Sequence, residues 1–147
     1  MKKLYFIGVI VLILFLVVII GLRISNKSDK KAEPVTQALN LELQTNNEGT
    51  VIVSVAPKNL SGPTWDFEIV LNTHSEELDA DLVEVSTLID ENGKEYKPVS
   101  WEGSPAGGHH REGILRFEPI SPRPKSIILK IRQVGGFEER SFAWQLK

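Results

Sequence analysis

The sequence predicts an all-β protein: a single immunoglobulin-like antiparallel β-sandwich of seven to eight strands, carried on an N-terminal transmembrane helix. Three observations predict this architecture. The first 22 residues contain one long uncharged apolar segment, the rest of the chain alternates apolar and polar residues with period two, and turn residues separate the alternating runs. Period-two alternation indicates half-buried strands, and many short strands separated by frequent turns are typical of a sandwich.

Residues 1–22 are predicted to form the transmembrane anchor. Residues 4–22 contain no charged side chain, and a helix of this length spans roughly 28 Å, close to the ~30 Å hydrocarbon core of a bilayer. The alternative is a cleaved signal peptide, but the apolar stretch is longer than is usual there and no small-x-small cleavage site follows it. Lys2 and Lys3 precede the segment as in an export signal. We therefore expect a single-pass protein of the cytoplasmic membrane with an extracytoplasmic C-terminal domain.

The remainder of the chain divides into a tether and one domain. Residues 23–34 are polar, lack periodicity and end in proline, which predicts a juxtamembrane tether. Residues 35–147 are then the β-sandwich domain. From residue 34 onward the chain has 11 lysines and arginines against 17 aspartates and glutamates, a net charge of −6. This charge argues against nucleic acid as a partner, because phosphate binding needs a basic face.

Eight alternating runs are the predicted strands. The clearest is "WDFEIVL", in which Trp65, Phe67 and Ile69 alternate with acidic residues. The turn "DENG" separates the fourth and fifth runs, and Gly135–Gly136 separates the last two. The predicted strands are residues 39–43, 51–55, 65–71, 82–89, 94–101, 113–117, 126–134 and 140–146.

Strand parity brings the three histidines together. If each connection reverses the chain direction, the loops after the first, third, fifth and seventh strands share one end of the sandwich. The histidines lie in two of these loops: His74 in residues 73–81, and His109 and His110 in residues 102–112. The tether joins the opposite end, so these loops are predicted to be membrane-distal.

Two uses of this loop end follow from its residue types. A protein or small-ligand partner is expected to contact the exposed polar and aromatic residues there, namely His74, Ser75, Trp101, His109, His110 and Arg111. The alternative is a copper or zinc site, since imidazole and carboxylate are ligands for these ions; its predicted ligands are His74, His109, His110, Asp79 and Asp81. A third use is structural: one histidine fastens the 102–112 loop to the 73–81 loop through a carbonyl hydrogen bond.

Catalysis is not expected. The chain has no cysteine, and Ser75 follows His74 directly, so in an extended segment the two side chains point apart and no nucleophile–base pair forms. We expect a non-enzymatic binding or assembly module without a cofactor, tethered to the membrane and acting through its histidine-bearing loops. The alternative function is a metal-binding accessory protein for copper or zinc.

The segments "THS" (Thr73–Ser75) and "GGHHR" (Gly107–Arg111) carry a resemblance that covers most of residues 50–120. The sequence around them resembles a family of small, uncharacterised, membrane-anchored extracytoplasmic prokaryotic β-sandwich proteins. The resemblance implies the same architecture and a role for these two loops. It implies no particular activity.

Overall fold

The computed structural model describes residues 41–146, which form a two-layered antiparallel β-sandwich. The predicted anchor (1–22) and tether (23–34) lie outside the described residues. Within residues 41–146, no helix has the length and apolar character needed to cross a membrane.

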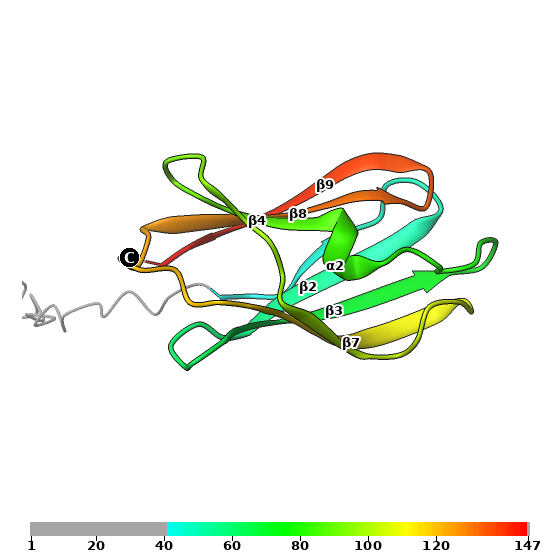
Figure 1. Cartoon of the computed structure of the whole chain (residues 1–147). Helices are drawn as coiled ribbons and strands as arrows, with labels where there is room; N and C mark the ends of the chain where they lie inside the picture. Colours follow the sequence, from blue (N-terminus) through cyan, green and yellow to red (C-terminus); the bar gives the residue numbers. More distant parts are fainter. Residues whose placement is uncertain (1–40, 147) are drawn as a thin grey trace, which may run out of the picture. The chain divides into compact units, whose positions relative to one another are not determined.

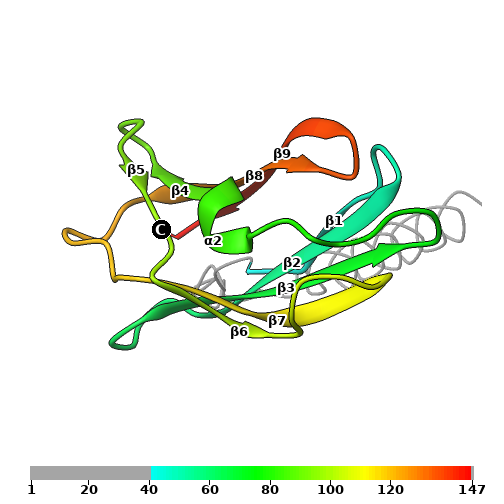
Figure 2. The same ribbon diagram turned by 45° about the vertical axis from the view of Figure 1, so that its right-hand side comes forward.

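One sheet has the strand order β1-β2-β3-β7-β6 and is called sheet A; the other has the order β5-β4-β8-β9 and is called sheet B. Figures 1 and 2 show the two layers, with the short helix α2 lying at one open side between them. The element bounds are β1 Gln44–Asn46, β2 Val51–Asn59, β3 Trp65–Thr73, α2 Leu82–Val85, β4 Ser86–Asp90, β5 Glu95–Tyr96, β6 Ser100–Gly103, β7 His110–Phe117, β8 Ser126–Val134 and β9 Phe137–Gln145.

The predicted antiparallel β-sandwich is confirmed, but residues 41–146 form nine strands and not the seven or eight predicted. Five of the predicted runs correspond to β2, β3, β7, β8 and β9. The core consists of their inward-facing residues. In β3 every second residue from Trp65 to Thr73 is buried. Phe67 is completely buried, with its ring edge-on to Phe117 at 5.6 Å and tilted against Trp144 at 5.7 Å. Period two therefore identified the core face of this strand correctly.

The prediction of one strand over residues 82–89 is wrong in its first half. Leu82–Val85 form the single turn α2, and only then does β4 begin at Ser86. The turn begins because the carboxylate of Asp81 accepts a hydrogen bond from the amide of Val83 at 2.9 Å, as an N-cap residue does. Alternating apolar residues had indicated a strand here, but the cap and the close contact of α2 with β8 and β6 favour a helical turn.

The predicted strand 94–101 is divided between the two sheets. Its first part is β5, paired with β4 in sheet B, and its last part is β6, paired with β7 in sheet A. Pro98 lies between them and has no amide hydrogen, so a continuous ladder is interrupted there. Of the first predicted strand, 39–43, residues 41–43 are not in a strand, and pairing begins only at Gln44–Asn46. Residues 39 and 40 lie outside the described residues.

The short strand β1 joins the edges of the two sheets. Its backbone pairs with β2, while the side-chain amide of Gln44 pairs with the backbone of Ala143 in β9, donating at 2.6 Å and accepting at 3.1 Å. The indole N–H of Trp144 donates to the carbonyl of Glu42 at 2.9 Å. The two bonds of Gln44 occupy backbone groups of β9 that would otherwise lie at an open sheet edge, and the Trp144 bond ties the segment before β1 to the same strand.

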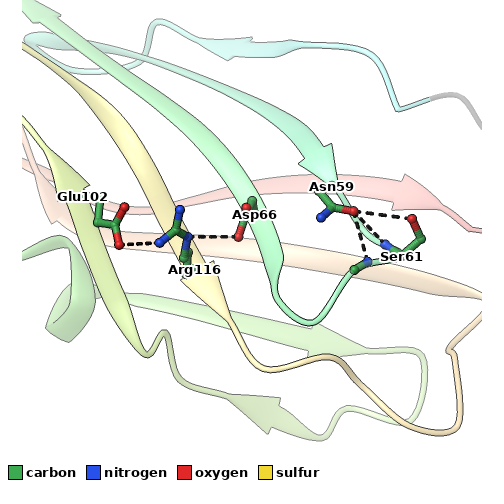
Figure 3. A network of polar contacts seen from close by, with 6 residues as sticks. Asn59, Ser61, Asp66, Glu102 and Arg116 are labelled. Carbon is green, nitrogen blue, oxygen red and sulfur yellow. Dashed lines mark hydrogen bonds and ion pairs between the residues drawn. The ribbon is translucent and has the colours of Figure 1, made fainter.

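The outer face of sheet A is polar and carries cross-strand ion pairs (Figure 3). Arg116 of β7 lies between Asp66 of β3, at 3.4 Å, and Glu102 of β6. At the adjoining turn, the side-chain carbonyl of Asn59 accepts hydrogen bonds from the amides of Ser61 and Gly62, each at 3.1 Å. This side-chain cap orders the β2–β3 connection.

We predict that Phe67→Ala lowers the free energy of unfolding by about 3–5 kcal/mol, because it leaves a cavity among fully buried rings. The neighbouring change Glu68→Ala removes only an exposed ion pair with Lys58 and should cost about 1 kcal/mol at most. Chemical denaturation of the full chain in detergent, followed by tryptophan fluorescence, measures both. Equal losses would show that this strand is buried on both faces.

Candidate functional site

Four loops gather at the end of the sandwich that lies away from the C-terminus, as Figure 1 shows. We call this the histidine end. The predicted shared position of the two histidine segments is confirmed: Asn72 pairs with His110 in the β3–β7 ladder, and the amide of Thr73 donates to the carbonyl of His109 at 3.0 Å. The loops of the histidine end are residues 47–50, 74–81, 104–109 and 135–136.

Backbone hydrogen bonds continue the β3–β7 ladder into the two histidine loops. The amide of Leu78 donates to the carbonyl of Gly108 at 3.0 Å, and the amide of Gly107 donates back to the carbonyl of Leu78 at 2.9 Å. The carboxylate of Glu77 accepts from the amide of Gly108 at 2.6 Å. Gly107 and Gly108 have φ angles of 108° and 72°, a region that residues with a side chain rarely adopt. The two glycines therefore permit this pairing of the loops.

Arg111 supports the same loops from inside the sandwich. It follows His110 in β7, but its side chain points inward and only 3% of the residue is exposed. One terminal nitrogen, Nη1, donates to the carbonyls of Leu78 at 2.7 Å and Ala80 at 2.8 Å. The guanidinium also lies over the Trp101 ring at 5.7 Å. A single buried cation thus fixes the course of the 74–81 loop.

Arg140 has the corresponding role in sheet B. It is 1% exposed and donates to the carbonyls of Val134 at 2.5 Å, Val51 at 3.1 Å and Glu48, while its Nε donates to the side-chain oxygen of Asn46 at 3.1 Å. These partners lie in the β1–β2 connection and the β8–β9 hairpin. Arg140 therefore joins the two remaining loops of the histidine end.

The electrostatics of the two arginines are similar. Burial lowers the pKa of Arg111, opposed by the nearby charges of Asp81 and Asp79, and burial lowers the pKa of Arg140, opposed by Glu48. Both guanidinium groups stay charged, because arginine does not lose its proton in proteins. Within residues 41–146 neither donates a hydrogen bond to a carboxylate, so carbonyl dipoles are their direct partners.

The predicted partner-contacting residues separate into two groups. His74, Ser75, His109 and His110 are exposed. Trp101 is half-buried, its indole N–H donates to the carbonyl of Ser104 at 3.0 Å, and Arg111 lies over its ring. Trp101 and Arg111 therefore lie inside the fold, where they support the loops.

The five predicted metal ligands do not converge. The part of the chain that the structure describes holds no group of three or more histidine, aspartate or glutamate side chains that could bind a metal ion. Asp81 is occupied as the cap of α2, and Asp79 is exposed. The expected metal site formed by His74, His109, His110, Asp79 and Asp81 is thus not formed by these side chains.

The expected hydrogen bond from a histidine ring to a carbonyl across the two loops is not formed by any of the three histidines, which all lie among the described residues. The carbonyl of His109 makes the contact to Thr73, while its ring is exposed and 4.0 Å from Glu77. The fastening groups are Glu77 and Arg111 instead. For Arg111 and Arg140 the sequence held a signal: each is in phase with the inward residues of its strand, Leu115 and Phe142 respectively. Nothing in the sequence singled out Glu77.

A small pocket of about 140 Å³ lies between the 74–81 loop and the β8–β9 hairpin. Its walls include the acidic residues Glu76, Glu77 and Asp79 and contain no lysine or arginine. Gln133, also in the wall, has a φ of 55°, which is unusual for a residue other than glycine. The carboxylates give this pocket a negative potential that disfavours anionic ligands.

No protein-family model matches the sequence, and neither a curated protein nor a solved structure matches the chain.

We predict that Arg111→Met lowers the free energy of unfolding by about 2–4 kcal/mol, because it removes two hydrogen bonds from a buried charged donor and leaves the Ala80 carbonyl without its donor, while the Leu78 carbonyl keeps only the amide of Gly107. Arg116→Met is the matched control on the same strand, where the ion pairs with Asp66 and Glu102 on the outer face are lost, at about 1 kcal/mol or less for each pair. Urea denaturation of the full chain in detergent compares the two. Similar losses would mean that the inward-facing arginine contributes no more to the free energy of unfolding than a surface arginine does.

Proposed function

We propose that the chain is a membrane-tethered, extracytoplasmic binding or assembly module of the immunoglobulin-like class. The strand order supports the class. Sheet A without β1 has the order β2-β3-β7-β6 and sheet B has β5-β4-β8-β9, which correspond to the A-B-E-D sheet and the C-F-G sheet with an added C′ strand. The resemblance to small membrane-anchored extracytoplasmic proteins supports the same class.

The observation that carries the proposal is the ordered histidine end. Binding residues commonly lie on loops that a rigid scaffold positions, and ordering before binding lowers the entropic cost of association. Here two buried arginines and a continued backbone ladder order four loops. His74, Ser75 and His109 remain exposed on these loops. They are the side chains that we assign to contact with a partner.

The charge of the histidine end limits the chemical class of partner that it can bind. Its four loops contain acidic residues and no lysine or arginine, and the two arginines nearby are buried. A phosphate backbone would be repelled by this surface. We propose a protein or small polar ligand as the partner, and no nucleic acid.

The position of the chain ends supports a membrane-distal location of the loops. Glu42 accepts from Trp144 near the end of β9, and the amide of Leu146 donates to Lys125, which directly precedes β8. Both therefore lie at the end opposite the histidine loops, where Figure 1 marks the C-terminus. An N-terminal anchor at residues 1–22 would therefore attach at that opposite end. The histidine end would face away from the membrane, where a soluble partner can reach it.

A non-enzymatic role is consistent with the exposure of His74 and Ser75, the two residues that come closest to resembling a catalytic nucleophile and its base. His74 and Ser75 are consecutive and both exposed. Nucleophilic catalysis needs the base within hydrogen-bond reach of the nucleophile, in a site that restricts water. The second candidate, a copper or zinc accessory protein, retains two predicted ligands that each have one neighbouring carboxylate: His110 beside Glu112 at 3.5 Å and His109 beside Glu77 at 4.0 Å.

The absence of cysteine from the chain allows a direct test of location. We predict that His109→Cys, in intact cells or in spheroplasts where an outer membrane is present, reacts with a membrane-impermeant maleimide. Asn92→Cys, exposed in the β4–β5 turn at the opposite end, should react as well. Labelling of both only after membrane lysis would place the domain on the cytoplasmic side.

The same two variants test where a partner binds. A photoreactive maleimide attached to the thiol of the His109→Cys variant should give a discrete cross-linked adduct in cells, because position 109 lies at the histidine end. The same reagent on the Asn92→Cys variant should give none. Gel mobility and mass spectrometry identify the adduct. Adducts from position 92 alone, or equally from both positions, would contradict a binding surface at the histidine end.

A further inference from the structure

The first segment of the described chain, residues 41–48, contributes no buried side chain to the core. Leu41 packs against the core but is only partly covered, and the other residues of the segment are half-buried or exposed. Every buried apolar side chain in residues 41–146 lies at Val51 or later. The core of the sandwich is therefore complete without this segment, which contains β1 and which we call the strap.

On sheet A the strap makes only a short ladder. It pairs with β2 over Gln44–Asn46, whereas the β2–β3 ladder runs from Val51 to Asn59. The hydroxyl groups of Thr45 and Ser54 add one side-chain hydrogen bond at 2.9 Å. Each such bond contributes little net free energy, because water replaces it in the open state and the ordering of the backbone opposes it. Without buried apolar area, this ladder opens at much lower cost than the core.

On sheet B, side chains of the strap and of β9 take the place of a ladder. The side-chain amide of Gln44 donates to and accepts from the backbone of Ala143, and the indole N–H of Trp144 donates to the carbonyl of Glu42. All three bonds are lost when the strap leaves the sandwich. The amide of Ala143 and the indole N–H of Trp144 therefore report whether the strap is in place.

Arg140 keeps direct partners when the strap leaves. Release removes its bonds to the side chain of Asn46 and the carbonyl of Glu48. Its bonds to the carbonyls of Val134 and Val51 remain, because β2 and β8 stay paired with their other neighbours. The opening therefore leaves no buried charge without a partner, which would otherwise make it costly.

We propose that the strap is releasable: residues 41–48 leave the sandwich while the two sheets stay packed. Thr50 marks the end of the opening, since its amide donates to the carbonyl of Gly135 at 3.3 Å and its hydroxyl donates to Glu76 at 2.6 Å. Release uncovers the edges of β2 and β9, and an unpaired strand edge is a surface to which an extended segment can add. The strap thus controls access to two sheet edges.

The strap is also the part of the described chain that directly follows the predicted tether. If the chain is anchored as proposed above, tension on the tether acts on the strap before it acts on any other strand, and pulling favours the released state. Release itself requires neither the anchor nor a partner.

Hydrogen exchange of the full chain in detergent, followed by NMR, measures the release. The Ala143 amide and the Trp144 indole N–H should have protection factors at least about 100-fold below those of the β3 amides, because they exchange without global unfolding. The double variant Thr45→Cys with Ser54→Cys, oxidised to the disulfide, joins residues that lie opposite each other in β1 and β2, and the chain has no other cysteine. The disulfide should raise both protection factors at least about tenfold, and its reduction should reverse the effect.

A disulfide between β3 and β7 is the matched control. In the double variant Val70→Cys with Glu112→Cys the two positions also lie opposite each other on sheet A, and the disulfide should leave both protection factors within about twofold. The proposal is overturned if the Ala143 amide and the Trp144 indole N–H of the unmodified chain are as protected as β3. It is also overturned if the disulfide between positions 45 and 54 does not raise their protection, or if the control disulfide raises it equally.

Discussion

Two buried guanidinium groups determine how the histidine end is built. Loops have backbone carbonyls that must find donors when they are covered, and a buried carbonyl without a donor costs about as much as a lost hydrogen bond. Arg111, on sheet A, donates hydrogen bonds to two carbonyls of the 74–81 loop. Arg140, on sheet B, donates hydrogen bonds to carbonyls beside the β1–β2 and β8–β9 connections. The apolar core holds the two sheets together, but these arginines hold the loops to the sheets.

Because side chains alternate between the two faces of a strand, adjacent residues have different roles. His110 and Arg111 are consecutive, yet the first lies on the outer face of sheet A and the second is buried between the sheets. Trp101, half-buried and stacked on Arg111, belongs to the inner support. His74 and His109 remain exposed on the ordered loops. A supported surface of this kind suits recognition, because its conformation is established before a partner arrives.

Periodicity predicted much of the fold and part of the site. The alternation of β3 and the inward phase of Arg140 were both readable from the sequence. Strand parity also placed the histidines together. The turn α2 was missed because it depends on the cap by Asp81, which competes with an apolar pattern. The use of Arg111 was missed because the predicted strand began at residue 113 and left Arg111 in an exposed loop, whereas β7 begins at His110 and turns the next side chain inward.

Amide hydrogen exchange of the unmodified chain tests the central claim most directly. If the buried arginines order the histidine end, the amides of Leu78, Gly107 and Gly108 should exchange within about tenfold of the amides in β3 and β7, because the loops can open only by breaking the hydrogen bonds that Arg111 donates to their carbonyls. Exchange of these loop amides at the rate of an unstructured peptide, while β3 and β7 stay protected, would contradict the account.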